Sequence, residues 1–237
     1  MALPSAATPK YKLVIPSLKK TVSFRQFLVK EEKALLIAQH SEDPDTMLDT
    51  LKAVIAACVT EKINVDDLAL FDVEYIFAQL RAKSVGEIVE LILKCDTCTD
   101  QLATVKYTID LTKLSVNVPD DHDKKIPLFD DVGVIMKYPS FSMIKKMEGV
   151  NTDNIDGLFE VICMCIEAVY NSEEMFYAVD QTTEELHDFV NNLTQAQFKK
   201  LQRFFDTMPK LEQRVMFTCP QCRKDHDKVI RGLDSFF

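Results

Sequence analysis

Glycine is scarce in this 237-residue sequence, which contains only five, and the glycine-rich motifs that cradle phosphates are missing. P-loop, GxGxxG, GxSxG and HExxH motifs are all absent, which argues against nucleotide, serine-hydrolase and zinc-protease chemistry. Histidine is also rare, and the four residues stand apart in polar surroundings: His40, His122, His187 and His226. We therefore expect surface histidines rather than catalytic bases, and a protein that is not an enzyme.

The sequence also lacks any apolar run near the roughly 18 residues that crossing a bilayer requires. Residues 1–10 have no apolar core of a signal peptide, so we expect a protein made in the cytosol, without stable membrane insertion. Acidic residues outnumber basic ones by 37 to 28, giving a net charge of −9. Because phosphate binding needs a concentrated basic face, this charge argues against nucleic acid as a partner.

Apolar residues are patterned in two ways along the chain. Spacing of three and four residues predicts helices over residues 28–39, 44–58, 70–82, 155–170, 183–190 and 195–208. Short extended runs predict strands over residues 11–15, 21–24, 87–94, 102–109, 114–118, 125–128, 132–138, 213–218 and 228–231. The run at 87–94 also fits a helix, but the CxxC turn directly after it favours a strand. Possible capping boxes begin at Thr182 and Thr194.

These elements predict an α+β fold, in which helical N-terminal and C-terminal layers surround a small, mostly antiparallel sheet bearing two CxxC zinc-knuckle hairpins. We expect a flexible tail over residues 1–10 and a single domain over 11–237. The parts of that domain are a mainly helical part (11–83), a β-rich part with the first knuckle (84–138), a helical part (139–210) and a second knuckle hairpin (211–237).

Four of the seven cysteines form two CxxC turns, each between two extended segments: Cys95, Cys98, Cys219 and Cys222. Two residues between thiolates allow both sulfurs to bind one tetrahedral ion at about 2.3 Å. Because the cost of loop closure grows only logarithmically with length, the long separation over residues 99–218 does not prevent a shared site. We predict one structural Zn²⁺ bound by all four cysteines, with no open position for catalysis.

Other roles for the cysteines have less support in the sequence. A redox CxxC usually opens a helix, which neither turn does, and nothing besides the thiols suggests an iron–sulfur cluster. Separate or mixed metal sites stay open as alternatives; His226, four residues after Cys222, could replace one sulfur, although an exposed loop histidine is also expected there. Cys58, Cys163 and Cys165 are expected to be small buried residues within helices.

Residues 70–77 (LFDVEYIF) and 80–87 (LRAKSVGE) form the most distinctive block of the chain. This block resembles the T4-type bacteriophage baseplate protein family. The early strand at residues 11–16, the EEK run at 31–33 and the pairing of two CxxC hairpins, the second ending near Phe236-Phe237, also fit that family. The resemblance covers residues 11–237.

The family comprises baseplate hub subunits and hub assembly factors of contractile-tailed phages. The resemblance therefore implies a non-enzymatic role in building the hub, as a virion protein or as a tail-assembly chaperone, with other hub or tail proteins of the same phage as partners. It implies a protein of the host cytoplasm during assembly and allows a place in the virion tail baseplate. The alternative is a zinc-ribbon regulator that binds nucleic acid, which the −9 charge disfavours.

Overall fold

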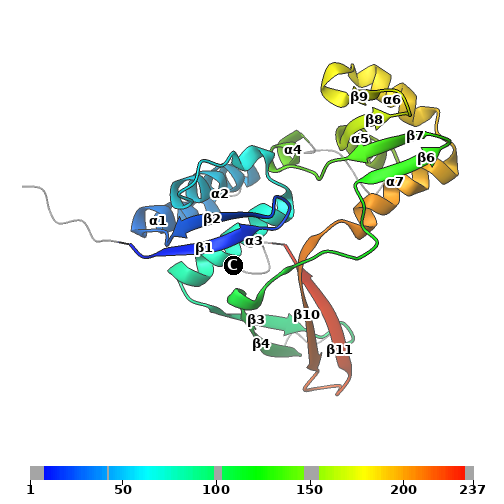
Figure 1. Ribbon diagram of the computed structural model, residues 1–237. Helices are drawn as coiled ribbons and strands as arrows, with labels where there is room; N and C mark the ends of the chain where they lie inside the picture. The colour runs from blue at the N-terminus through cyan, green and yellow to red at the C-terminus, as the bar shows by residue number, and fades with distance from the viewer. Residues whose placement is uncertain (1–7, 42, 99–102, 147–154, 233–237) are drawn as a thin grey trace, which may run out of the picture. The chain divides into compact units, whose positions relative to one another are not determined.

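The computed structural model describes residues 8–41, 43–98, 103–146 and 155–232. The chain forms two compact units, one made of residues 1–117 and 210–237 and the other of residues 118–209. Both units combine helices with small antiparallel sheets (Figure 1), so the predicted α+β class is confirmed.

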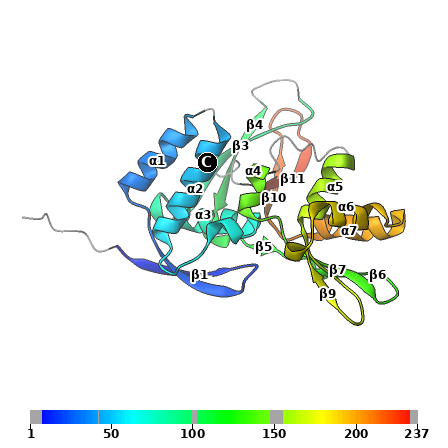
Figure 2. The ribbon, with the colours of Figure 1, turned by 90° about the horizontal axis from the view of Figure 1, so that it is seen from above.

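The first unit begins with a β-hairpin and three helices. The hairpin strands are β1 (Lys10–Ile15) and β2 (Lys20–Arg25), which pair antiparallel along their whole length. The helices are α1 (Val29–Gln39), α2 (Pro44–Cys58) and α3 (Leu70–Ser84), with the 3-10 turn η1 (Val65–Asp67) before α3. α2 packs against α1 and α3, and α3 also contacts β1 (Figure 2).

Local sequence explains where these helices begin and end. Asp43 caps α2 by accepting the Thr46 N–H at 3.2 Å, and Pro44 takes the first helical position, where no N–H is needed. α3 ends at Ser84, whose hydroxyl donates back to the Leu80 carbonyl at 2.6 Å. The buried face of α2 consists of Leu51, Val54, Ile55 and Cys58.

The rest of the first unit is a second apolar core that joins strands far apart in sequence. Its strands are β3 (Ile88–Lys94), β4 (Thr104–Asp110), β5 (Val116–Asn117), β10 (Lys210–Thr218) and β11 (Asp225–Arg231), with the 3-10 turn η2 (Leu111–Lys113) after β4. They form one sheet of β3 and β4 and another in the order β11-β10-β5. Leu211, Val215 and Phe217 of β10 pack in one buried cluster with Ala78 of α3 and Val89 of β3. This core therefore unites the middle of the chain with residues 210–231.

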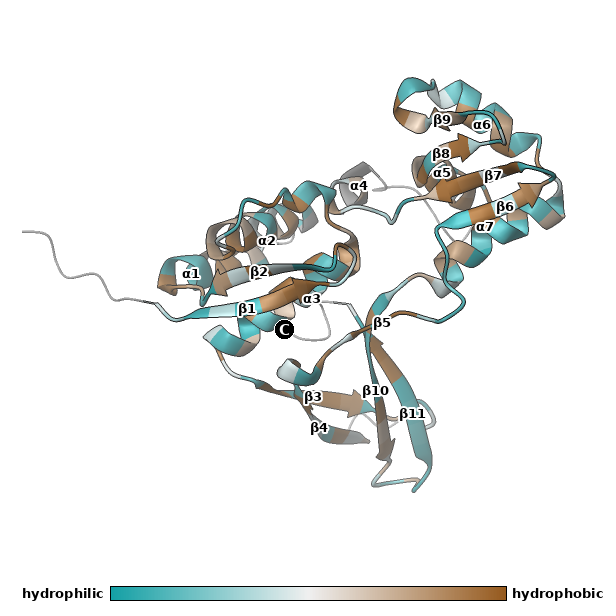
Figure 3. Cartoon of the chain, in the orientation of Figure 1, coloured by the Kyte–Doolittle hydropathy of each residue, from teal (hydrophilic) through white to brown (hydrophobic). Residues whose placement is uncertain are grey.

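The second unit is a four-stranded antiparallel sheet with helices on one face (Figures 1 and 2). The strands, in the order β6-β7-β8-β9, are β6 (Lys125–Phe129), β7 (Val132–Met136), β8 (Ile166–Tyr170) and β9 (Met175–Tyr177). The helices are α4 (Phe141–Lys146), α5 (Ile155–Met164), α6 (Thr183–Asn191) and α7 (Gln195–Thr207), with the 3-10 turn η3 (Ala178–Asp180) before α6. β7 and β8 are among the most hydrophobic segments of this unit (Figure 3), and Val134 and Ile166 are fully buried.

Two expectations about the layout are wrong. The helix predicted over residues 155–170 ends at Met164, and Ile166 starts β8, which pairs with β7. In that stretch Ile166 and Ala168 are buried whereas Glu167 is exposed, an alternation typical of a strand. The strands of the described residues also form four separate sheets instead of the one small sheet that we expected.

Several smaller expectations can be compared with the structure. Both capping boxes, at Thr182 and Thr194, are confirmed. The three single cysteines are buried as expected, although Cys165 lies just after α5 rather than inside it. Residues 1–7 of the expected tail and the Phe236-Phe237 pair lie outside the described residues, and Lys10 already belongs to β1. Within the described ranges, no helix has both the length and the apolar character needed to cross a membrane.

Asp72, in the distinctive block, is a fully buried carboxylate that ties α3 to the β1–β2 turn. Its side chain is 0% exposed, and it accepts hydrogen bonds from the Ser17 N–H at 2.9 Å and from the Ser17 hydroxyl. It also lies in the first turn of α3, where the helix dipole favours a negative charge. Asp72 therefore links the start of α3 to the hairpin and contributes to the stability of the fold.

We predict that Asp72→Ala lowers the free energy of unfolding by about 1–3 kcal/mol, because the half-buried Ser17 donors lose their acceptor. Asp120→Ala, a change at an exposed carboxylate, should leave stability within about 0.5 kcal/mol of the wild type. Denaturant unfolding followed by circular dichroism measures both. Equal stabilities for the two variants would contradict the role assigned to Asp72.

Glu31 is the second buried carboxylate, and it joins the hairpin to the start of α1. It is 6% exposed and accepts from Arg25 Nη2 at 2.9 Å and from the Leu28 N–H at 2.8 Å. Burial works to raise the pKa of Glu31, but the hydrogen bonds from Arg25 and Leu28 outweigh it and hold the pKa below its ordinary value. Folding therefore favours the ionised form.

A lowered folded-state pKa means that the contribution of Glu31 is present above its unfolded pKa, about 4.3, and is lost as pH falls through the folded value. We predict that Glu31→Gln is less stable than the wild type at pH 7 and that this difference shrinks as pH falls below about 4. Urea unfolding at a series of pH values measures the difference. A gap that stays constant from pH 7 to pH 3 would contradict this prediction.

Candidate metal centre

The two CxxC turns each connect the strands of an antiparallel pair. Cys95 follows the last residue of β3, and its N–H donates to the Ala103 carbonyl at 3.0 Å near the start of β4. Cys219 follows the last residue of β10, and its N–H donates to the Lys224 carbonyl at 2.9 Å before β11. Arg223 has a φ of 57°, the left-handed conformation that closes this second turn. The backbone thus holds one cysteine of each pair at a strand end.

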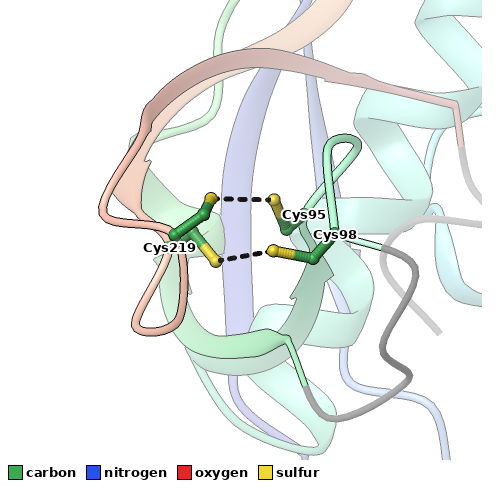
Figure 4. Close-up of side chains that lie close together, drawn as sticks. Cys95, Cys98 and Cys219 are labelled. Atoms are coloured by element: carbon green, nitrogen blue, oxygen red, sulfur yellow. Dashed lines mark hydrogen bonds between the residues drawn. The ribbon is translucent and has the colours of Figure 1, made fainter.

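The structure brings all four predicted ligands together. The sulfur atoms of Cys95, Cys98, Cys219 and Cys222 lie within 4.8 Å of one another. Cys95 and Cys222 are 3.7 Å apart, Cys98 and Cys219 are 3.9 Å apart, and the two turns face each other (Figure 4). Four sulfurs bound to one tetrahedral Zn²⁺ at 2.3 Å are separated by about 3.8 Å, whereas a disulfide needs about 2.05 Å. All seven cysteines are free, so this spacing fits a metal ion and not a disulfide.

Burial and ionisation also suit a metal ligand set. Cys219 is 0% and Cys95 8% exposed, whereas Cys98 and Cys222 are half-buried. Burial works against ionisation of Cys95, but hydrogen bonds from the Thr97 N–H and its neighbours lower its pKa to about 6. The hydrogen bond between Cys98 and Cys222, together with burial, raises the pKa of Cys98 to about 12. Without a cation, the four neighbouring sulfurs cannot all ionise easily. The charge of a bound divalent cation would stabilise all four thiolates together.

His226 lies beside the cluster and is not the exposed loop residue that we expected. It belongs to β11, its side chain is 9% exposed, and its ring stacks on Phe217 with centroids 4.9 Å apart. Its Nε2 atom is 3.1 Å from the Cys95 sulfur. The imidazole is thus placed to hydrogen-bond a cysteine sulfur, as residues around metal ligands commonly do.

A second contact, which was not predicted from the sequence, links β11 to the first cysteine turn. Lys228 donates to the Asp96 carboxylate at 2.6 Å and to the Lys94 carbonyl at 2.7 Å. Lys228 lies two residues after His226 on β11, so both side chains fall on the same face of the strand. The sequence alternation could have indicated that Lys228 shares a strand face with His226. It could not have indicated Asp96 as the partner of Lys228, because Asp96 lies on the other hairpin.

Elsewhere the described residues hold no other cluster of three or more metal-ligating side chains. His122 was expected at the surface, but it is half-buried and hydrogen-bonds Thr207 at 3.0 Å and Tyr138 at 3.1 Å. His187 contacts Glu160 at 3.3 Å, and His40 is exposed. These histidines therefore do not assemble into a site.

Comparisons with known proteins agree with the resemblance seen in the sequence. The family described as "T4 bacteriophage base plate protein" matches residues 8–237. The chain is similar to the baseplate hub assembly protein gp26 of Enterobacteria phage T4, with 24% identity over 229 residues, covering 96% of this chain and 98% of that relative. No solved structure matches the chain.

We predict that the purified protein contains one zinc ion per chain and that Cys219→Ser loses it. Added zinc should stabilise the wild type, by about 4 kcal/mol when free zinc is 1,000 times its dissociation constant, and should not stabilise the variant. Metal analysis and thermal unfolding with and without zinc measure both effects.

Cys58→Ala is the matched control, because Cys58 is buried in the same unit, away from the four ligands, and is 1% exposed. It should lose stability and keep its zinc. Zinc well below one ion per chain in the wild type, or a Cys219→Ser protein as stable as the wild type, would overturn the metal site.

Proposed function

The chain belongs to the family of T4 bacteriophage base plate proteins, and we propose that it is a non-enzymatic structural or assembly protein of the baseplate hub of a contractile-tailed phage. The observation that carries this proposal is the length of the match, which extends over residues 8–237. The similarity to a hub assembly protein over 98% of that relative's length supports the assembly role in particular. Its partners would then be other hub or tail proteins, met in the host cytoplasm or in the tail baseplate.

The four cysteines are proposed to hold one structural Zn²⁺ that joins the β3–β4 and β10–β11 turns. The spacing of the sulfurs and the burial of Cys95 and Cys219 support this ligand set. When bound, the metal would supply a cross-link and charge neutralisation only, because four sulfur ligands leave no position for a substrate. His226 would act beside the ion as a hydrogen-bond donor to Cys95, with its replacement of a sulfur as the alternative.

The organisation expected from the sequence, a single domain over residues 11–237 that carries both knuckle hairpins, stays a proposal too. A metal held by both turns would make the hairpins one rigid body. A protein whose task is to present surfaces during assembly needs such rigidity more than it needs an active site.

We predict that phage lacking this gene produces tails without complete baseplates, and that a plasmid copy restores them. A copy with both Cys95→Ser and Cys98→Ser should restore far fewer, because the hairpins lose their cross-link, whereas a Thr97→Ser copy should restore them fully. Electron microscopy of purified tails counts complete baseplates. Intact, contractile baseplates made without the gene would refute the hub role.

A further inference from the structure

An apolar cavity of about 190 Å³ lies within the first unit, between α1, α2 and α3. Its walls are mostly apolar, and they are supplied by Phe27, Leu35, Leu36, Met47, Phe77 and Val85. Leu36 and Val85 are 51% and 59% exposed, so two large apolar side chains of the wall are also in contact with solvent. An engineered cavity of about 150 Å³ with comparable walls binds benzene. The cavity described here can therefore hold one side chain the size of leucine or phenylalanine.

Arg81 is the cation of this cavity, and part of it is buried without a partner. Within the described part of the chain, its Nη1 atom is buried and has no hydrogen-bond partner. Burial lowers the pKa of Arg81 from its ordinary value. Glu32 also lines the cavity, but no ion pair joins it to Arg81. Buried donors are nearly always paired, so the guanidinium needs an explanation.

Position in α3 supplies part of that explanation. Arg81 lies in the last turn of α3, where the helix dipole favours a positive charge. A cation outside the cavity would interact with the helix dipole equally well. Lys83, in the same turn, does so while pairing with Glu87. Placement of Arg81 against an apolar cavity goes beyond what the dipole requires.

We propose that this cavity binds a segment of a partner protein that presents one large apolar side chain next to a carboxylate. The apolar side chain would fill the cavity, and the carboxylate would accept the hydrogen bond that the buried Nη1 atom of Arg81 does not make within the described residues. Charge-assisted hydrogen bonds between a carboxylate and a guanidinium are strong and directional, so the pair would add specificity to an otherwise apolar contact. The proposal rests on the proposed function only for the source of the segment, which would be another hub protein.

The test is a titration of short peptides into the full chain, whose methyl groups are isotope-labelled and whose signals are monitored by nuclear magnetic resonance. The probes are two short peptides, acetyl-Asp-Phe-amide and acetyl-Asn-Phe-amide, which differ only in charge. We expect the Asp peptide to shift the Met47 and Leu36 methyl signals and to bind about tenfold more tightly than the Asn peptide, the ratio that about 1.4 kcal/mol of added interaction gives.

Arg81→Met should abolish the preference for the Asp peptide while keeping the apolar stem, and Arg81→Lys should keep part of it. Lys33→Met, a change at an exposed residue of α1 outside the cavity wall, should bind both peptides as the wild type does. Equal binding of the two peptides to the wild type, a preference that survives Arg81→Met, or no shift of the cavity methyls would each overturn the proposal. The wild-type comparison decides the matter even if a variant fails to fold, and it is independent of whether phage lacking the gene builds baseplates.

Discussion

The packing of β10 and β11 against α3 and the β3–β4 pair is the interaction on which the first unit depends. Leu211, Val215 and Phe217 are buried in one cluster with residues of α3 and β3, and this apolar contact brings the two cysteine turns within ligand distance. A metal ion could then cross-link positions that the apolar core has already placed side by side. Burial of the apolar core offsets the entropy lost on closing the loop over residues 99–218, so an ion bound there would add stability without having to organise the fold.

α3 is the element around which the polar interior is arranged. At its start Asp72 accepts from the β1–β2 turn, and near its end Arg81 lines an apolar cavity, where its Nη1 atom has no hydrogen-bond partner among the described residues. The two charged side chains differ in their hydrogen bonding. Asp72 accepts hydrogen bonds from Ser17 and stabilises the fold, whereas the buried Nη1 atom of Arg81 makes no hydrogen bond within the described residues, and its desolvation costs free energy. Both lie in the block of residues 70–77 and 80–87 that resembles the baseplate family.

Sequence patterns predicted those features that depend on neighbours along the chain. The CxxC spacing, the capping boxes at Thr182 and Thr194 and the helices with clear apolar faces all follow from local geometry. The helix predicted over residues 155–170 is wrong in its second half because Ile162, Ile166 and Val169 follow helical spacing, whereas residues 166–170 form β8 and pair with β7. Lys228 was missed, and the burial of His226 was not expected, because their contacts with Asp96 and Cys95 lie across the two hairpins.

The connectivity also constrains the order in which the fold can form. Residues 118–209 are contiguous and make their own sheet and core, so the second unit can fold as soon as it has been synthesised. The first unit cannot finish then, because β5 lacks its partner β10 and the Cys95 turn lacks the Cys219 turn. A metal bound early by Cys95 and Cys98 would hold two sulfur ligands and reach four only when the last hairpin docks. Completion of the metal centre would therefore coincide with completion of the first unit.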